Sequence, residues 1–412
     1  MEAQKAELIV RLRTLAPAGV IALIPAAVLA AAPPADEHPV LNDIAAEVSP
    51  DALKATVQAL VGFGTRHTLS DTTSNSRGIG AARRWASGRF EQISQACGGC
   101  LRIITPSQTV TGPRIPRPAE VVDVVAIQRG TTDPDRVEEQ GLYGGKVIAD
   151  YARQQGWRVE ADLNNDIIGD TTGQSGVVDN THIRVFSEGT KAVETDRQAA
   201  ARRYNGGEVD SPSRNLARYI DDLATRYLTH FSAAMVYRTD RYSRGGDQVP
   251  FLENGYPAVR FTEAVENYTR EHQDVREEAG VRYGDRIDAL DFPYLAQVTR
   301  LNAITMASLA WAPPPPEGLA IEGAVGVDTG LKWQASPGAA AYRVYWRDTT
   351  APRWEHSRPV GDATSTVLKG IIVDDWLFGV ASVSAEGFVS PVEFPGPAGS
   401  FISPAPEKTA KP

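Results

Sequence analysis

The stretches HIRVF (182–186), PSRNLARYIDDLATRYL (212–228) and AAMVY (233–237) decide the fold class of this chain. The first and third are short apolar runs typical of strands, and the second is long enough for a helix. A strand, a helix and a second strand in this order indicate a sheet covered by helices. We therefore predict an α/β domain.

The same alternation continues on both sides of these stretches. Ser49-Pro50-Asp51 places a capping residue, a helix-compatible proline and an acid before an apolar helical pattern. Further helices are predicted at 79–93, 143–155 and 292–305, and further strands at 101–104, 121–127, 160–168 and 258–262. The expected architecture is a mixed sheet flanked by helices.

The sequence changes in character after Pro313 to Pro316, a run that predicts a short stiff linker. Beyond it, short strands at 330–334, 341–346, 366–368 and 376–384 indicate a small β-sandwich. Trp333, the alternating run at 342–346 and Phe378-Gly379-Val380 resemble a fibronectin type III domain. We expect this second domain to span residues 317–402.

Composition limits the possible functions. The chain has 412 residues, of which 42% are hydrophobic and 23% charged, as in ordinary soluble globular proteins. Its formal net charge of -9 argues against a surface that holds phosphate backbones. Nucleic acid is therefore not an expected partner.

Residues 1–35 have the features of a secretory signal peptide. Lys5, Arg11 and Arg13 precede an apolar run that ends in alanines and prolines. The run is shorter than the roughly 20 residues of a spanning helix, and Pro25 interrupts it. We expect export to a secreted or periplasmic location, and membrane attachment only if this segment remains uncleaved.

Cys97 and Cys100, the only cysteines, stand in Cys-Gly-Gly-Cys before a predicted strand. In an exported chain this spacing can close a small structural disulfide. A redox-active pair is the alternative, but such a motif usually opens a helix.

Three places in the middle of the chain can carry chemistry. The adjacent carboxylates Glu138 and Glu139 precede a turn into a helix, where α/β sheets place functional groups, although acidic pairs are usually solvated surface. Asp166 stands at the end of a predicted strand, where it either binds a ligand or caps a turn. His272 lies in a polar loop after a strand, which is also a common place for a surface histidine.

Taken together, these places resemble the M28 family of zinc metallopeptidases. The resemblance covers residues 45–311 and rests on collinear segments at 62–68, 138–142, 164–166, 184–189 and 263–272. It implies an enzyme with two neighbouring zinc ions that removes N-terminal residues from peptide or protein substrates.

The resemblance also implies a role for each candidate residue. Glu138 would be the general acid and base, Glu139 and His272 would bind one zinc ion, and Asp166 would bind the other. Residues 241–250, including Asp247, resemble a loop that borders the substrate cleft. Gln248 stands in this loop where the family leads us to expect a histidine.

One departure from the family is large. Members carry a strand with a His-x-Asp ligand motif, a bridging aspartate, a helix and a further strand before the paired glutamates, whereas here Val137 joins Glu138 directly. Such a unit needs about 30 residues or more. Because the lost strands would sit inside the sheet, we expect unpaired strand edges and one bound zinc ion or none.

Two functions from different classes follow. The first is a secreted zinc-dependent aminopeptidase by descent whose activity is impaired in this chain. The alternative is a non-enzymatic secreted binding protein in which the α/β domain is a relic and the β-sandwich binds the partner.

Overall fold

A computed structural model describes residues 37–112, 115–128 and 142–395. The predicted signal peptide at 1–35 lies outside these ranges, as do Glu138, Glu139 and the Val137-Glu138 junction. Residues 396–402, at the end of the expected β-sandwich, also lie outside them.

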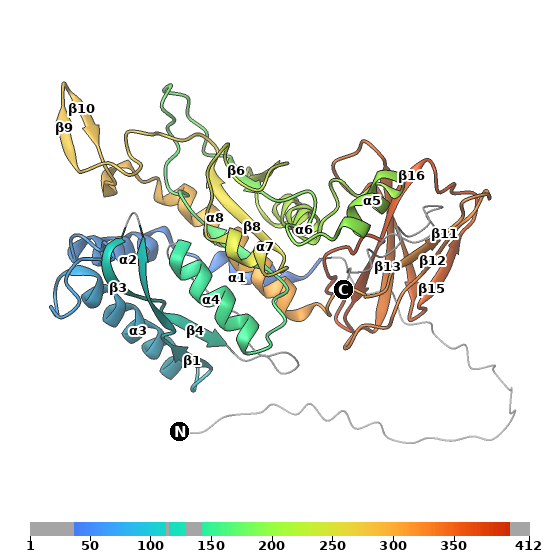
Figure 1. Cartoon of the computed structure of the whole chain (residues 1–412), viewed down its shortest axis with the longest axis horizontal. Coiled ribbons are helices and arrows are strands. Elements are labelled where there is room, and N and C mark those ends of the chain that lie inside the picture. The colour runs from blue at the N-terminus through green and yellow to red at the C-terminus, as the bar shows by residue number, and fades with distance from the viewer. Residues whose placement is uncertain (1–36, 113–114, 129–141, 396–412) are drawn as a thin grey trace, which may run out of the picture. The chain divides into compact units, whose positions relative to one another are not determined.

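The elements follow one another as drawn in Figure 1. The helices are α1 (Pro39–Ala46), α2 (Pro50–Gly62), α3 (Gly78–Ala96), α4 (Leu142–Gln154), α5 (Asp196–Asn205), α6 (Pro212–Tyr227), α7 (Gln248–Glu253), the short 3-10 helix η1 (Ile287–Ala289) and α8 (Phe292–Trp311). The first strands are β1 (Leu101–Ile104), β2 (Ser107–Gly112), β3 (Ile115–Val122), β4 (Val125–Gln128), β5 (Asp162–Asn165), β6 (His182–Phe186), β7 (Ser232–Val236) and β8 (Ala258–Glu263). The later strands are β9 (Arg276–Glu278), β10 (Val281–Tyr283), β11 (Ala320–Glu322), β12 (Thr329–Lys332), β13 (Ala341–Asp348), β14 (His356–Gly361), β15 (Ser365–Leu368) and β16 (Trp376–Val383).

A four-stranded mixed sheet in the order β5-β8-β6-β7 forms the centre of the α/β part. β8 pairs in parallel with β5 and antiparallel with β6, and β6 pairs in parallel with β7. All the residues of β8 are buried, as expected for a strand covered on both faces. The prediction of a mixed α/β sheet is confirmed.

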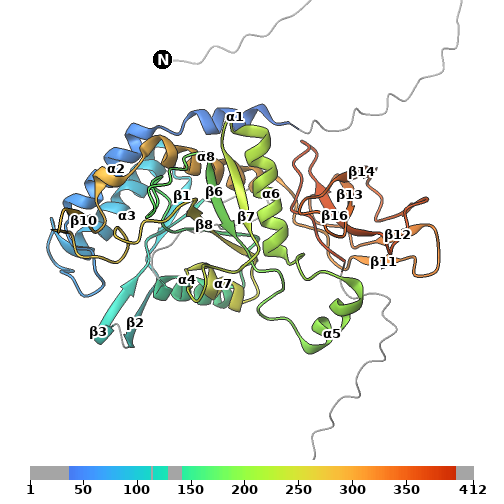
Figure 2. The same cartoon turned by 90° about the horizontal axis from the view of Figure 1, so that it is seen from above.

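Helices cover both faces of this sheet. Figure 2 shows α1, α6 and α8 on one side and α4 and α7 on the other. α6 begins after Ser211, whose hydroxyl accepts from Arg214 N at 3.1 Å, and it buries Leu216 and Ile220 in the core shared with β6 and β8. Within the described residues, none of the helices has the length and apolar character to span a bilayer.

The sheet is interrupted between β4 and β5. Among the described residues β4 pairs with β1 alone, and β5 pairs with β8 alone. Val125 and Ile127 of β4 share a core with Ala258, which stands opposite Asp162 in the β5–β8 pair. Side-chain packing rather than hydrogen bonding between strands therefore joins the two sheets, and each presents a strand edge at this junction.

The single strand predicted at 121–127 is wrong in its extent. The chain divides there into the end of β3 and the start of β4, with Asp123 and Val124 between them. β3 turns back on β2 as a hairpin, while β4 pairs with β1. The apolar run continues through the break, so Asp123 is the only sign of it in the sequence.

The C-terminal β-region (residues 317–395) consists of two three-stranded antiparallel sheets, β11-β12-β15 and β14-β13-β16. Their inner faces share a core that includes Trp333, Val344, Leu368 and Val380. The strands predicted from 330 to 384 are all present, and β11 and β14 were not predicted. Buried tryptophan and alternating inward residues are typical of sandwich packing.

The C-terminal β-region is not attached by a free linker. Pro313, Pro314 and Pro316 are buried rather than exposed. Asp210, which precedes α6, accepts two hydrogen bonds from Arg347 of β13 at 2.8 and 2.9 Å and one from Arg218 of α6 at 2.9 Å. All three side chains are almost fully buried, so this charge cluster holds the β-region against the α/β part.

We expect Asp210→Asn to lower the free energy of unfolding by about 3–5 kcal/mol, because it leaves two buried arginines without their counter-charge. Urea unfolding of the full chain measures the change. Asp222→Asn, which removes a largely exposed carboxylate from α6 itself, should cost less than about 1 kcal/mol. Equal losses in the two variants would contradict the structural role of Asp210.

Cys97 and Cys100 form a disulfide that closes the turn between α3 and β1. Gly98 and Gly99 both have positive φ, a conformation that glycine adopts without strain. The predicted disulfide pairing is confirmed.

The carboxylates of Asp123, Asp162 and Asp247 influence one another at the interruption of the sheet. Asp123 is 3% exposed, and within the described part of the chain neither of its carboxylate oxygens has a hydrogen-bond partner. Burial raises its pKa to about 7, the carboxylate of Asp247 adds to the rise, and Arg83 opposes it. Burial and Asp247 likewise raise the pKa of Asp162 to about 8. The junction is therefore most stable when these acids are protonated.

We expect the free energy of unfolding to fall as the pH rises from about 4 to about 7, since folded Asp123 retains a proton that the unfolded carboxyl has already lost. Asp123→Asn should reduce this slope by up to about 1.4 kcal/mol per pH unit. Urea unfolding from pH 4 to 8 measures it, with the exposed Asp374→Asn as control. An unchanged slope in Asp123→Asn would contradict the raised pKa.

Candidate functional site

Two loops meet at one edge of the central sheet. β5 and β8 are parallel, so their C-terminal ends lie at the same edge. Asp166 directly follows β5, and Glu263 is the last residue of β8. Polar groups at the carboxyl ends of strands in α/β sheets are well placed to meet a ligand. We take these two loops as the candidate site.

Residues of strand β8 hold both the backbone and the side chain of Asp166. Its backbone N donates to Phe261 O at 3.2 Å, and its carbonyl oxygen accepts from the Thr262 hydroxyl at 3.0 Å. Its carboxylate oxygen Oδ2 lies 3.0 Å from Nη1 of Arg260. The Asp166 side chain is still 40% exposed, so the carboxylate both anchors to the sheet and reaches the surface.

His272 lies in the loop that follows β8. Its side chain is exposed, and its backbone φ is +52°, a left-handed conformation that is uncommon outside glycine. Burial raises the pKa of the nearby Asp285, whereas the positive charges of His272 and Arg66 lower it. The Asp166 carboxylate thus pairs with Arg260, whereas His272 acts electrostatically on Asp285.

The loops that carry these two residues are joined to each other. Arg270, two residues before His272, forms an ion pair with Asp170, four residues after Asp166. Asp170 N also donates to the Glu263 carboxylate at 2.8 Å, and Glu263 N donates to Ile167 O at 2.8 Å. Burial raises the pKa of Glu263 to about 8, although the bond from Asp170 N opposes the rise. The structure therefore brings the two loops together.

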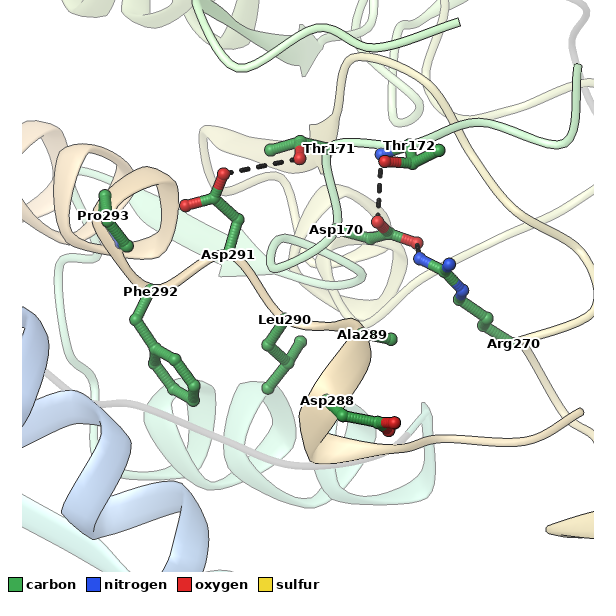
Figure 3. A pocket seen from close by; sticks show the side chains of 10 residues that line it. All are labelled: Asp170, Thr171, Thr172, Arg270, Asp288, Ala289, Leu290, Asp291, Phe292 and Pro293. Atoms are coloured by element: carbon green, nitrogen blue, oxygen red, sulfur yellow. Dashed lines mark hydrogen bonds and ion pairs between the residues drawn. The ribbon is translucent and has the colours of Figure 1, made fainter. Parts of the chain in front are cut away.

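A groove of about 460 Å³ opens beside this junction. Figure 3 shows Asp170 reaching toward Arg270 on one side and Asp291 facing Thr171 on the other. The Asp291 carboxylate caps α8 by accepting from Tyr294 N at 3.0 Å. The groove is lined mainly by residues of the loop after Asp166 and of the segment that leads into α8. It therefore borders the candidate site.

A buried chain of alternating charges runs from Asp166 toward the His272 loop. Arg260 binds both Asp166 and Asp240, with Nη1 3.1 Å from Asp240 Oδ2. Arg241 binds Asp240 in turn and donates to Glu266 at 2.9 Å. We call this set of five residues the ionic chain. The sequence offered one sign of it, an arginine between apolar residues in the fully buried strand β8.

Gln248, at the position where a histidine was expected, is fully buried and supports the ionic chain. Its Nε2 donates to Asp240 Oδ2 at 2.8 Å, and its Oε1 accepts from Asn164 at 2.9 Å. Asp247, predicted to border the substrate cleft, precedes α7 and acts electrostatically on Asp123 and Asp162. Its charge therefore acts at the interruption of the sheet.

The donor types present fit zinc, which takes carboxylate oxygens and imidazole nitrogens. Asp166 and His272 would supply one of each. Within the ranges that the structure describes, no three His, Cys, Asp or Glu side chains form a group that could hold a metal ion. The other predicted residues, Glu138 and Glu139, lie outside those ranges, so the ligand set stays a prediction.

The chain is similar in sequence to several known proteins. No family model matches it. A probable zinc metalloprotease of Pyrenophora teres f. teres is 35% identical over an alignment 430 positions long, gaps included, which covers 89% of this chain and 88% of that protein. Another, of Leptosphaeria maculans, is 36% identical and covers 85% of this chain and 95% of its own length. The solved structure of the Legionella pneumophila LapA aminopeptidase matches with a TM-score of 0.44 at 14% identity, over 71% of this chain and 80% of that one, too low to support the fold or the function. From its identity to the first two proteins over most of its length, we conclude that the chain belongs to the family of these probable zinc metalloproteases.

Proposed function

We propose that this chain derives from a secreted zinc aminopeptidase of the M28 family and that its own metal centre is incomplete. The observation that carries the proposal is the junction between the Asp166 loop and the His272 loop at one edge of the sheet. In the proposed ancestor, both loops bring ligands to the metal. The substrates would be peptides or proteins, from which N-terminal residues are removed.

Each residue of the site would have a distinct role, either in metal binding or in proton transfer. Glu139, Asp166 and His272 would hold a single zinc ion, because three protein ligands are the usual number for a catalytic zinc. Zinc, when bound, would lower the pKa of water and polarise the scissile carbonyl. Glu138 would accept the proton that the attacking water loses and would later return it to the leaving amine.

The length of the alignment supports an internal loss. It has 430 positions, whereas 89% of 412 residues is about 367, so about 60 positions have no residue in this chain. A strand-helix-strand unit needs about 30 residues or more, which fits within that number. The unpaired edges of β4 and β5, on either side of residues 129–141, support the Val137-Glu138 junction as the place of the loss.

The N- and C-terminal parts complete the proposal. The segment 1–35 would direct export and then be removed. Residues 317–402 would form a fibronectin type III-like domain, a proposal supported by the two three-stranded sheets that enclose Trp333. The buried contacts of Arg347 with Asp210 suggest that this domain stabilises the α/β part in addition to any binding role.

A non-enzymatic secreted binding protein is the second candidate. One observation favours it: Arg260 already supplies a counter-charge for Asp166, so the carboxylate does not need a metal ion to balance it. In that case the α/β part would be a folded relic and the C-terminal β-region would bind the partner.

We expect the purified chain to hydrolyse aminoacyl nitroanilides at a rate at or near the background, even with added zinc, because the segment before Glu138-Glu139 lacks the family's His-x-Asp motif and bridging aspartate. The Pyrenophora teres relative, assayed in parallel, serves as the positive control and should show turnover. If this chain showed robust turnover and Glu138→Gln abolished it, the prediction of impaired activity would be contradicted.

We expect at most one zinc ion per chain, measured by elemental analysis of protein dialysed against zinc. Asp166→Asn and His272→Ala should each release it, whereas replacing the exposed His356 by alanine should not. Inserting the relative's unmatched segment between Val137 and Glu138 should raise the count to two. Two tightly bound ions in the unaltered chain would exclude an incomplete centre, and none would favour the binding protein.

A further inference from the structure

We propose that the Cys97–Cys100 disulfide is a thiol-exchange site, which small monothiols open and close while the chain stays folded. The proposed peptidase function makes no use of the motif Cys-Gly-Gly-Cys. This inference rests on the turn between α3 and β1 alone, so it requires no metal ion and does not depend on the proposed function.

The turn between α3 and β1 is also closed by hydrogen bonds that do not need the disulfide. Ser94 Oγ donates to Leu101 O at 3.0 Å and accepts from Leu101 N at 3.2 Å, so one side chain holds both backbone groups of the first residue of β1. Gly99 N donates to Ser94 O at 2.7 Å, and Gly98 N donates to Gln95 O at 3.2 Å. Ser94 is 8% exposed, so water competes little for its bonds. The turn therefore has a second set of restraints that survives reduction.

The two elements that the disulfide joins are each anchored elsewhere as well. α3 buries Ala81 and Ala82 near its start, and β1 pairs with β4 along its whole length, from Leu101 to Ile104. The two cysteines are only 3 positions apart in the sequence, and a crosslink across so short a loop restricts the unfolded chain least. Opening the disulfide should therefore leave the fold in place.

The sulfur of Cys97 is open to a thiol from solvent. Cys97, Gly98 and Gly99 are exposed, and Cys100 is half-buried. A Cβ atom at Gly98 or Gly99 would meet no atom of the described residues within 4 Å, so the space around the loop is free. Access to the sulfur is one of the factors that limit thiol–disulfide exchange. A small thiol can therefore reach Cys97 without movement of the fold.

The surroundings also select the sulfur that is attacked. Cys97 directly follows α3, and its Sγ lies 3.3 Å from Ser94 O. The partial negative charge at a helix C-terminus disfavours a thiolate at this position. Cys100 stands beyond the helix, and the sulfur that forms the more stable thiolate leaves faster. We therefore expect attack at the exposed Cys97 and release of Cys100.

The exchange proceeds in two steps that consume two small thiols. In the first, a thiolate sulfur bonds to Cys97 Sγ, the bond between the two protein sulfurs breaks, and Cys100 leaves as a thiolate that takes up a proton. In the second, another thiolate attacks the small-molecule sulfur bound to Cys97, which forms the small disulfide and releases Cys97 as a thiolate. Two small thiols are oxidised to one disulfide, and the protein disulfide is reduced to two thiols. The reverse sequence closes the site.

We expect reduced glutathione to open the disulfide in the purified full chain under native conditions. Because opening is local, its rate should rise in proportion to the glutathione concentration and exceed the rate of global unfolding about 10-fold or more. A disulfide that only unfolding exposes would be reduced no faster than the chain unfolds. Iodoacetamide labelling and mass spectrometry measure the free thiols, and the circular dichroism spectrum should stay that of the folded chain.

The site of attack can be identified from the intermediate. When the reaction is stopped early with iodoacetamide, tandem mass spectrometry of the tryptic peptide 90–102 locates the bound glutathione. Glutathione should be found on Cys97, with the carbamidomethyl group on Cys100.

Ser94→Ala tests the hydrogen bonds that hold the reduced turn. Reduction should hardly change the urea midpoint of the unaltered chain but should lower that of Ser94→Ala, because the variant has lost both side-chain bonds to Leu101. Ser87→Ala, about two turns earlier in α3, is the control and should behave like the unaltered chain.

Two results would overturn the proposal. They are a disulfide that glutathione reduces only at the rate of unfolding, and loss of the folded spectrum on reduction, since either would show a purely structural disulfide. Glutathione on Cys100 rather than Cys97 would contradict the assigned site of attack. An equal fall in the urea midpoint on reduction of the unaltered chain and of Ser94→Ala would contradict the role of Ser94.

Discussion

The positive charge of Arg260, buried in the central strand, constrains much of the structure around it. An unpaired charge at such a position would cost several kcal/mol, so carboxylates must approach it. Asp166 comes from the loop after β5, and Asp240 comes from the segment after β7. Two stretches far apart in the sequence are thereby drawn to the same strand. Gln248 completes the arrangement because it satisfies Asp240 and Asn164 at once.

A different constraint acts where the sheet is interrupted. Hydrogen bonds between strands normally hold a sheet together, but among the described residues β4 and β5 are not paired, and the two sheets meet through the core that contains Val125 of β4 and Ala258 of β8. Asp123 and Asp162 end up at this junction with raised pKa values of about 7 and 8. Buried polar groups without a hydrogen-bond partner, such as the carboxylate of Asp123 among the described residues, are rare in folded proteins. The raised pKa values and the interrupted sheet thus occur at the same place in the fold.

The sequence predicted the elements well where local pattern determines them. The strand at 182–186 has the predicted bounds, and α6 ends one residue before the expected position, because apolar spacing and capping residues act over a few positions. The hairpin β2–β3 was not predicted because its strands lack a clear apolar alternation. In the candidate site, Asp166 and His272 were predicted from motifs, and their role as ligands stays a prediction. Their partners Arg260 and Asp240 could not be predicted, since ion pairs between residues 20 positions apart depend on tertiary approach. Burial of the proline run was likewise not predicted, since it depends on tertiary packing.

The charge of Asp166 is balanced within the protein. A carboxylate whose only counter-charge is a metal ion becomes a liability once that ion is gone, because like charges then repel one another. Asp166 is different, since Arg260 compensates it within the protein and Asp240 and Arg241 continue the alternation of signs. The electrostatic support of the Asp166 carboxylate therefore comes from the fold. In the proposed function, loss of a neighbouring segment would remove metal ligands while the ion pairs that hold Asp166 remained, so the ionic chain would not depend on a bound metal ion.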